Sequence, residues 1–319
     1  MSLSDALSAA PLSRFLLPVG DGHVLQVETL GEPSGEPVLV LHGGPGSGCS
    51  PRLAELYDPA RQFVVFFDQR GAGRSVPAGE TRANTTARLI DDIESLRRRL
   101  GIARWRVTGG SWGATLALAY AAAHPEAAAS LVVRSVFMPG EANVRWFFQG
   151  LAEVCPEAWQ ALAATVPAAE RGDLLAALQL RLNGADAERA RTAAAAWAAY
   201  ERAVAEPAAA AGRDGLPTAA ELDRLVLKYR LQAHYLRAGC FLGETDFVAA
   251  CAALNLPVTL IHGRLDRVCP PANAERLHAR IRRSRLVWVE GCGHEAFHPA
   301  MVAAWRNALL PSADGAEGR

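Results

Sequence analysis

Gly109-Gly-Ser-Trp-Gly113 is the stretch that decides the fold, because it matches the pattern G-x-S-x-G. The run 105–108, Trp-Arg-Val-Thr, predicts a short strand before it, and the Ala/Leu-rich run 112–124 predicts a helix after it. This pattern between a strand and a helix is typical of a nucleophile elbow, whose glycines let the backbone turn sharply and expose the serine hydroxyl. Ser111 is therefore predicted at a helix N-terminus, where backbone N–H groups face developing negative charge.

The alternation of strand and helix continues on both sides of this turn. Residues 86–100 have helical periodicity, with Thr85 or Thr86 as the N-cap and Gly101 as the stop, and residues 299–310 predict a last helix. The other apolar runs that predict strands are 37–41, 63–67, 131–133, 257–261 and 285–289. Strands that alternate with helices predict an α/β fold with a mostly parallel central sheet flanked by helices.

The alternation stops between about Pro139 and Asn255. Ala, Leu, Glu and Arg dominate this segment, and prolines and glycines divide it into several helix-length pieces. We therefore expect an inserted all-helical subdomain. The chain is predicted to divide into a first core part at 1–136, a helical insertion at 137–255 and a second core part at 256–319.

Composition excludes several classes of protein. The 319 residues carry 33 Lys+Arg and 33 Asp+Glu, so the chain lacks the basic surplus of a nucleic-acid-binding protein. No apolar run reaches the roughly 18 residues of a transmembrane helix, and the N-terminus lacks a signal-peptide pattern, so we expect a cytoplasmic protein without membrane contact. The 6 cysteines have no CxxC spacing and are expected to be reduced thiols. Lys228 is the sole lysine, which we interpret as genomic base bias.

A serine nucleophile needs a base, and the base needs an acid that orients it. Asp266 follows the predicted strand 257–261, and His294 follows the predicted strand 285–289. Both residues are therefore expected at the carboxyl edge of the sheet, where α/β folds place their sites. The order serine, acid, histidine along the chain predicts a catalytic triad of Ser111, Asp266 and His294.

The segment His42-Gly-Gly-Pro-Gly46 follows the predicted strand 37–41. Its glycines let a backbone N–H approach a reacting carbonyl, so the N–H groups of Gly44 and Trp112 are predicted to form an oxyanion hole. The run has no G-x-G-x-x-G and no G-K-[ST], which disfavours a nucleotide site. The histidines lack paired spacing such as HExxH, which disfavours a metal site. The predicted chemistry needs neither a metal nor an organic cofactor.

These motifs together resemble the proline iminopeptidase (prolyl aminopeptidase) family of α/β-hydrolases. The resemblance covers about residues 20–310, and its most specific pieces are Gly109-Gly-Ser-Trp-Gly113 and Asp68-Gln-Arg-Gly71. It implies an α/β-hydrolase fold with a helical cap. It also implies a serine exopeptidase that releases an N-terminal residue, preferably proline, from a small peptide with a free N-terminus.

The resemblance also implies residues that hold the substrate. Phe137 and Phe147 match positions of an apolar pocket for the proline ring. Glu201 ends the segment Trp197-Ala-Ala-Tyr-Glu201, which is similar to the family's Trp-x-x-Trp-Glu, and implies a carboxylate for the substrate's ammonium group. The family's second carboxylate position holds the neutral Gln232, so one charge-assisted contact is missing.

This departure keeps three other functions open on the same scaffold. A broader aminopeptidase or amino-acid amidase would suit a pocket with one carboxylate. A carboxylesterase would ignore amines, and Glu201 would then be a surface charge. A non-catalytic ligand receptor is disfavoured by the intact Ser111, Asp266 and His294, because a pure binding protein needs no such set.

Overall fold

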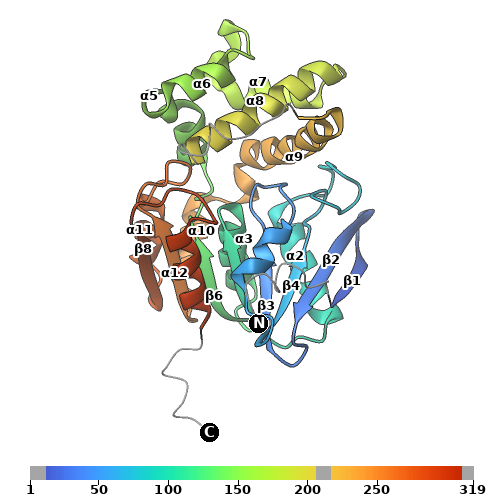
Figure 1. The fold of residues 1–319 in the computed structure, drawn as a ribbon, viewed down its shortest axis with the longest axis vertical. Helices are drawn as coiled ribbons and strands as arrows, with labels where there is room; N and C mark the ends of the chain where they lie inside the picture. Colours follow the sequence, from blue (N-terminus) through green and yellow to red (C-terminus); the bar gives the residue numbers. More distant parts are fainter. Residues whose placement is uncertain (1–11, 206–216, 311–319) are drawn as a thin grey trace.

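The structure is a computed structural model that describes residues 12–205 and 217–310. Its centre is an eight-stranded sheet in the order β1-β2-β4-β3-β5-β6-β7-β8 (Figure 1). Every neighbouring pair from β4 to β8 is parallel, which confirms the predicted α/β fold. The strands are β1 (Ser13–Gly20), β2 (His23–Gly31), β3 (Glu36–Leu41), β4 (Gln62–Phe67), β5 (Trp105–Gly110), β6 (Ala128–Arg134), β7 (Val258–Gly263) and β8 (Ser284–Val289).

Strands β1 and β2 form an antiparallel hairpin at one edge of the sheet, and the sequence analysis did not predict it. The turn Gly20-Asp-Gly22 has positive φ at all three residues, a conformation that favours glycine. Alternate side chains of β2, including Leu25 and Val27, are fully buried. This period of two was the available signal for the hairpin.

The strand order creates a switch point at the middle of the sheet. β3 and β5 are neighbours, but the chain continues from β3 to β4 on one side and from β5 to β6 on the other. Parallel α/β sheets bind ligands at such a point, beyond the carboxyl ends of the strands. The segments that follow β3, β5, β7 and β8 carry the predicted triad and Gly44.

The helices beside the sheet include α2 (Thr86–Arg99), α3 (Trp112–Ala123), α11 (Ala272–His278) and α12 (Pro299–Leu309). The side chain of Thr85 accepts a hydrogen bond from the Arg88 N–H and caps α2, as predicted. Gly101 follows the end of this helix at φ +67°. The predicted helix ends therefore agree with the structure to about one residue.

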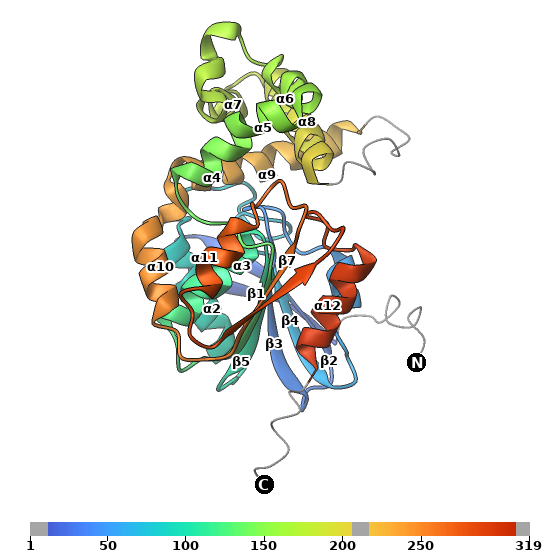
Figure 2. The ribbon, with the colours of Figure 1, turned by 90° about the vertical axis from the view of Figure 1, so that its left-hand side faces the viewer.

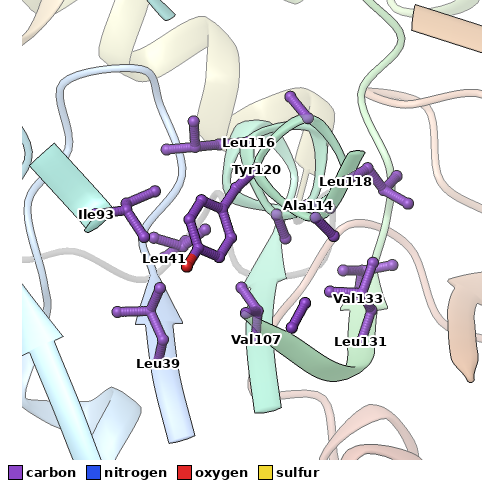
Figure 3. Packing of buried hydrophobic residues seen from close by; sticks show 14 of the residues in the cluster. Leu39, Leu41, Ile93, Val107, Ala114, Leu116, Leu118, Tyr120, Leu131 and Val133 are labelled. Atoms are coloured by element: carbon purple, nitrogen blue, oxygen red, sulfur yellow. The ribbon is translucent and has the colours of Figure 1, made fainter. Parts of the chain in front are cut away.

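Alternating side chains of the central strands fill two cores, one on each face of the sheet. Leu39 and Leu41 belong to the core under α2 and α3, whereas Val38 and Val40 belong to the core under α12. Figure 3 shows α3 packed on the sheet, with Leu39 and Leu41 beside Val107. Burial on both faces explains why these strands read as continuous apolar runs.

The described part of the segment between β6 and β7 contains helices joined by short loops, and no strand. Figures 1 and 2 show α4 to α9 stacked above the carboxyl edge of the sheet. These helices have their own apolar core, in which Trp197 stacks on Tyr229 with ring centroids 4.8 Å apart. The helices are α4 (Glu141–Arg145), α5 (Leu151–Val154), α6 (Pro156–Ala163), α7 (Leu174–Asn183), α8 (Ala187–Ala205), α9 (Ala219–Arg237) and α10 (Glu244–Ala252).

Helix α10 differs from the others because it packs against α3 in the sheet layer. Its Phe247 and Cys251 belong to the same core as Leu39. None of the helices within residues 12–205 and 217–310 has both the length and the apolar character needed to cross a bilayer. Short helical turns complete the fold at η1 (Pro51–Leu56), η2 (Trp146–Gly150), η3 (Ala168–Asp173) and η4 (Gly239–Phe241).

A buried carboxylate joins α2 to α3 below the site. The side chain of Glu94 is 5% exposed and accepts hydrogen bonds from Arg97 Nε at 2.8 Å and from the Tyr120 hydroxyl at 2.6 Å. Trp105 Nε1 of β5 donates to the same hydroxyl at 3.2 Å. Chiefly because of the hydrogen bonds from Arg97, the pKa of Glu94 falls to about 2 despite its burial.

We expect Glu94→Gln to lower the free energy of unfolding by about 2 kcal/mol near neutral pH, because a charged hydrogen-bond acceptor is lost. The folded pKa of Glu94 lies below its ordinary value of 4.5, so its stabilisation is present above that pH and is lost as the pH falls towards 2. Urea unfolding at pH 7 and pH 3 measures the difference. Glu126→Gln, at a side chain 70% exposed, is the control. An equal loss at both pH values would contradict the assignment.

Candidate active site

The turn between β5 and α3 holds Ser111 at φ 57° and ψ −124°, a backbone conformation that L-residues rarely adopt. Two close approaches require glycine beside it. A Cβ on Gly109 would lie 2.3 Å from the Gly113 carbonyl oxygen, and a Cβ on Gly113 would lie 2.1 Å from the Leu41 carbonyl oxygen. The Ser111 N–H donates to the Arg134 carbonyl at 3.0 Å, which ties the turn to β6. The structure thus has the geometry of a nucleophile elbow.

Ser111 opens into a cavity of about 320 Å³. The cavity is bounded by the carboxyl edge of the sheet and by residues of the helices above it. A volume of this size suits a small ligand. The predicted site residues among its lining are Gly44, Ser111, Phe137, Phe147, Glu201, Gln232 and His294.

Asp266 and His294 are joined as predicted. His294 Nδ1 lies 2.8 Å from Asp266 Oδ2, and the Cys269 N–H donates to Asp266 Oδ1 at 2.8 Å. The Asp266 side chain is fully buried, and burial alone would raise its pKa. The charge and hydrogen bond of His294 outweigh burial, so the net pKa of Asp266 lies below its ordinary value. An ionised aspartate here keeps the proton of neutral His294 on Nδ1 and leaves Nε2 able to accept another.

Ser111 and His294 line the same cavity but are not hydrogen-bonded to each other. Within the described residues, the Ser111 side chain lies near the thiol of Cys269 and affects its pKa. Burial raises the pKa of Cys269 well above its usual range, Asp266 adds to this, and the hydrogen bond with Ser111 opposes it. A hydrogen bond from the Ser111 hydroxyl to His294 Nε2 would complete the predicted relay.

A buried network holds the loop after β3 against the elbow. The Gln69 N–H donates to His42 Nε2 at 3.0 Å, so His42 carries its proton on Nδ1 and donates it to the Gly43 carbonyl at 2.9 Å. Gln69 Nε2 donates to the His42 carbonyl, and Trp112 Nε1 donates to Gln69 Oε1 at 3.0 Å. Burial lowers the pKa of His42 and keeps it neutral.

This network places both predicted oxyanion-hole residues near Ser111. A Cβ on Gly43 would lie 3.6 Å from the Ser111 Cβ, and the adjacent Gly44 lines the cavity. Trp112 is the first residue of α3, and the first N–H groups of a helix have no partner within it. The two predicted donors thus come from the two elements that meet at the switch point.

Aromatic side chains form one wall of the cavity. Phe147 packs edge-on against Phe148 and Tyr200, with ring centroids 5.0 Å away in both pairs. The Tyr200 hydroxyl donates to the Phe147 carbonyl at 2.6 Å and fixes this residue to α8. Phe137 lines the cavity from the loop after β6. The wall offers apolar surface beside Ser111.

Glu201 lies at the cavity on α8, with donors from α9 around its carboxylate. Lys228 Nζ lies 3.0 Å from Glu201 Oε2, and the Tyr229 hydroxyl donates to the same oxygen at 2.8 Å. Gln232 Nε2 donates to Glu201 Oε1. Burial raises the pKa of Glu201, but Lys228 and the three hydrogen bonds outweigh it and keep the pKa below its ordinary value.

The sequence analysis missed Lys228, Tyr229, His42 and Gln69 as parts of the site. Lys228 and Tyr229 stand one turn before Gln232 on α9, and this spacing was the available signal for them. His42 and Gln69 each follow a strand at the carboxyl edge, as Asp266 does. Lys228 lines the cavity, although as the sole lysine of the sequence it was attributed only to base composition.

The chain is similar to known proteins over most of its length. Residues 36–300 match the family model described as the alpha/beta hydrolase fold. A proline iminopeptidase of Xylella fastidiosa is 40% identical over 297 residues, which cover 92% of this chain and 94% of that protein. A proline iminopeptidase of Arabidopsis thaliana is 38% identical over 300 residues, which cover 92% of this chain and 78% of that protein.

Solved structures share the fold at lower identity. A proline iminopeptidase-related protein of Thermus thermophilus matches with a TM-score of 0.61 at 24% identity, covering 93% of this chain and 96% of that one. The esterase RhEst1 of Rhodococcus matches with a TM-score of 0.62 at 21% identity, covering 93% of this chain and 98% of that one. The family itself is shown by the fold model and by identities near 40% over almost the whole length. This chain belongs to the proline iminopeptidase family of α/β-hydrolases.

Proposed function

We propose that the protein is a serine-type prolyl aminopeptidase that releases N-terminal proline from small peptides. One observation carries this proposal: a single cavity joins Ser111 and His294 to a carboxylate, Glu201, that can hold a substrate nitrogen. The relatives named proline iminopeptidase, which match over almost the whole chain, support it. A cytoplasmic location belongs to the proposal and rests on the sequence pattern.

In the first step His294 acts as the general base. Its Nδ1–H is held by Asp266, so Nε2 accepts the Ser111 hydroxyl proton while Oγ forms a bond to the acyl carbon of the first residue. The carbonyl oxygen becomes an oxyanion that accepts hydrogen bonds from the N–H groups of Gly44 and Trp112. Asp266 stays ionised and stabilises the imidazolium that forms.

The intermediate then collapses and the peptide bond breaks. His294 gives its proton to the leaving amine, and the acyl group remains on Ser111 as an ester. A water molecule gives a proton to His294 and attacks the carbonyl carbon of this ester, which forms a second oxyanion. Ser111 recovers its proton as free proline leaves, so atoms and protons balance.

The residues above the sheet select the substrate in this proposal. Helices α4 to α9 of the predicted insertion at 137–255 act as a cap, whereas α10 belongs to the sheet layer, and Phe137 and Phe147 contact the pyrrolidine ring. Glu201 and Gln232 accept hydrogen bonds from the substrate's α-nitrogen, which places the first peptide bond at Ser111. The nitrogen of an N-terminal proline has no N–H to donate once it is acylated, so a peptide with a blocked N-terminus does not bind productively.

We expect kcat/KM for a prolyl naphthylamide to exceed that for the alanyl and leucyl naphthylamides by about 10², which is about 2.7 kcal/mol of transition-state discrimination. N-acetyl-prolyl naphthylamide should not be cleaved. Ser111→Ala should lower all turnover by about 10³ or more, whereas Ser95→Ala, at an exposed helix position, should not. Equal rates for proline and alanine, or turnover of p-nitrophenyl acetate alone, would overturn the proposal.

We expect Gln69→Leu to lower kcat about tenfold with KM changed less than about twofold, because the loop that carries Gly44 loses its anchor to Trp112 and oxyanion contacts form only in the transition state. Steady-state kinetics on the prolyl substrate measures this. Gln149→Leu, at an exposed position of the helical layer, is the matched control. A rise in KM at unchanged kcat would show that the network serves binding instead.

A further inference from the structure

Lys228 occupies an unexpected position for the sole lysine of the chain. It projects from α9 into the cavity, and its ammonium group lies 3.0 Å from Glu201 Oε2 and 3.2 Å from the Tyr229 hydroxyl. The ammonium also lies 4.4 Å from the centre of the Tyr229 ring, a favourable cation–π distance. The side chains of Lys228 and Glu201 are 23% and 25% exposed, so water screens this pair only partly.

The pair leaves the nitrogen-binding end of the cavity without net charge. Glu201 is the one carboxylate among the described residues that line the cavity, and Lys228 cancels its charge. The third group at this end, Gln232, is neutral. The other fixed charge in the described lining is the cation Arg134, so no second carboxylate favours a positive ligand.

Hydrogen-bonding capacity nevertheless remains. An ionised carboxylate accepts about four hydrogen bonds, and Lys228, Tyr229 and Gln232 supply three to Glu201. Gln232 is 6% exposed, and its Oε1 has no partner among the described residues because its Nε2 faces Glu201. This end of the cavity therefore offers acceptors for N–H groups.

We propose that Lys228 is a specificity-determining residue that makes the cavity recognise the substrate's α-nitrogen by its N–H group and not by positive charge. The preferred first residue then contains a five-membered ring whose nitrogen is uncharged when the substrate is bound. The inference rests on the proposed prolyl aminopeptidase function and names the form of substrate that the site takes.

The physical reason is a balance of solvation and charge. An ammonium group loses its hydration on entering the cavity, and attraction to a carboxylate normally compensates for this loss. Here the attraction to Glu201 is opposed by repulsion from Lys228. An uncharged ring nitrogen avoids both the loss of hydration and the repulsion, and it still donates its N–H.

A pair of substrates separates charge from shape. Prolyl and thiazolidine-4-carbonyl naphthylamides share a five-membered ring with an N–H, but the ring sulfur of the second withdraws electrons and leaves its nitrogen largely uncharged near pH 7. The prolyl nitrogen is mostly protonated at that pH. The ratio of kcat/KM for the thiazolidine substrate to kcat/KM for the prolyl substrate does not depend on the fraction of active enzyme.

We expect this ratio to exceed one in the unmodified protein and to fall about tenfold in Lys228→Met. Without Lys228, the Glu201 carboxylate near the bound substrate nitrogen favours the protonated form of that nitrogen by about one pKa unit or more. Lys228→Arg retains the charge and should keep the ratio. Gln232→Glu adds a negative charge with Lys228 in place and should lower the ratio in the same direction, which tests the proposal even if Lys228→Met does not fold.

The results separate the two proposals. An unchanged ratio in both Lys228→Met and Gln232→Glu would overturn the role of Lys228 while leaving a prolyl aminopeptidase. A ratio below one in the unmodified protein would overturn it as well. If the unmodified protein and all variants failed to cleave either ring substrate but still hydrolysed p-nitrophenyl acetate, the proposed function and the inference that rests on it would both be overturned.

Discussion

The close approach of α3 to β3 is the constraint on which the site depends. The backbone at Gly113 lies so near the Leu41 carbonyl that no side chain fits between them. The helix can start this close to the sheet only if the chain turns sharply at Ser111, and the turn holds that residue at positive φ. Packing of α3 on the apolar strands maintains this strain, which a flexible loop would release. The position of Ser111 at the cavity is thus a product of sheet packing.

A second constraint comes from placing a carboxylate within an apolar layer of helices. Glu201 needs hydrogen-bond donors there, because an ionised group removed from water is otherwise strongly destabilising. Helix α9 supplies all three, from Lys228, Tyr229 and Gln232. The contact between α8 and α9 therefore stabilises the helical layer and at the same time sets the electrostatic character of the cavity. The same side chains thus stabilise the contact between the two helices and set the charge of the cavity.

Most of the sheet and the core of the site could be predicted from the sequence, for a physical reason. Strands buried on both faces are continuous apolar runs, and the residues just after them, Ser111, Asp266 and His294, must meet at one edge. The hairpin of β1 and β2 has a weaker signal, because a half-exposed edge alternates apolar with polar side chains. The spacing of Lys228 from Gln232 could not reveal the ion pair, since its partner Glu201 lies on another helix and only their packing brings the two charges together.

The place where the helical layer enters the chain has an evolutionary consequence. The insertion leaves after β6 and returns at β7, and these two strands are hydrogen-bonded neighbours in the sheet. Because the two strands are parallel, the chain leaves at the carboxyl end of β6 and must return to the amino end of β7, and α10 lies beside α3 on this return. The helices before α10 can lengthen, shorten or exchange residues without disturbing a strand pair. Substitutions selected in this one segment can change which molecules enter the cavity, while the residues at the carboxyl edge of the sheet stay the same.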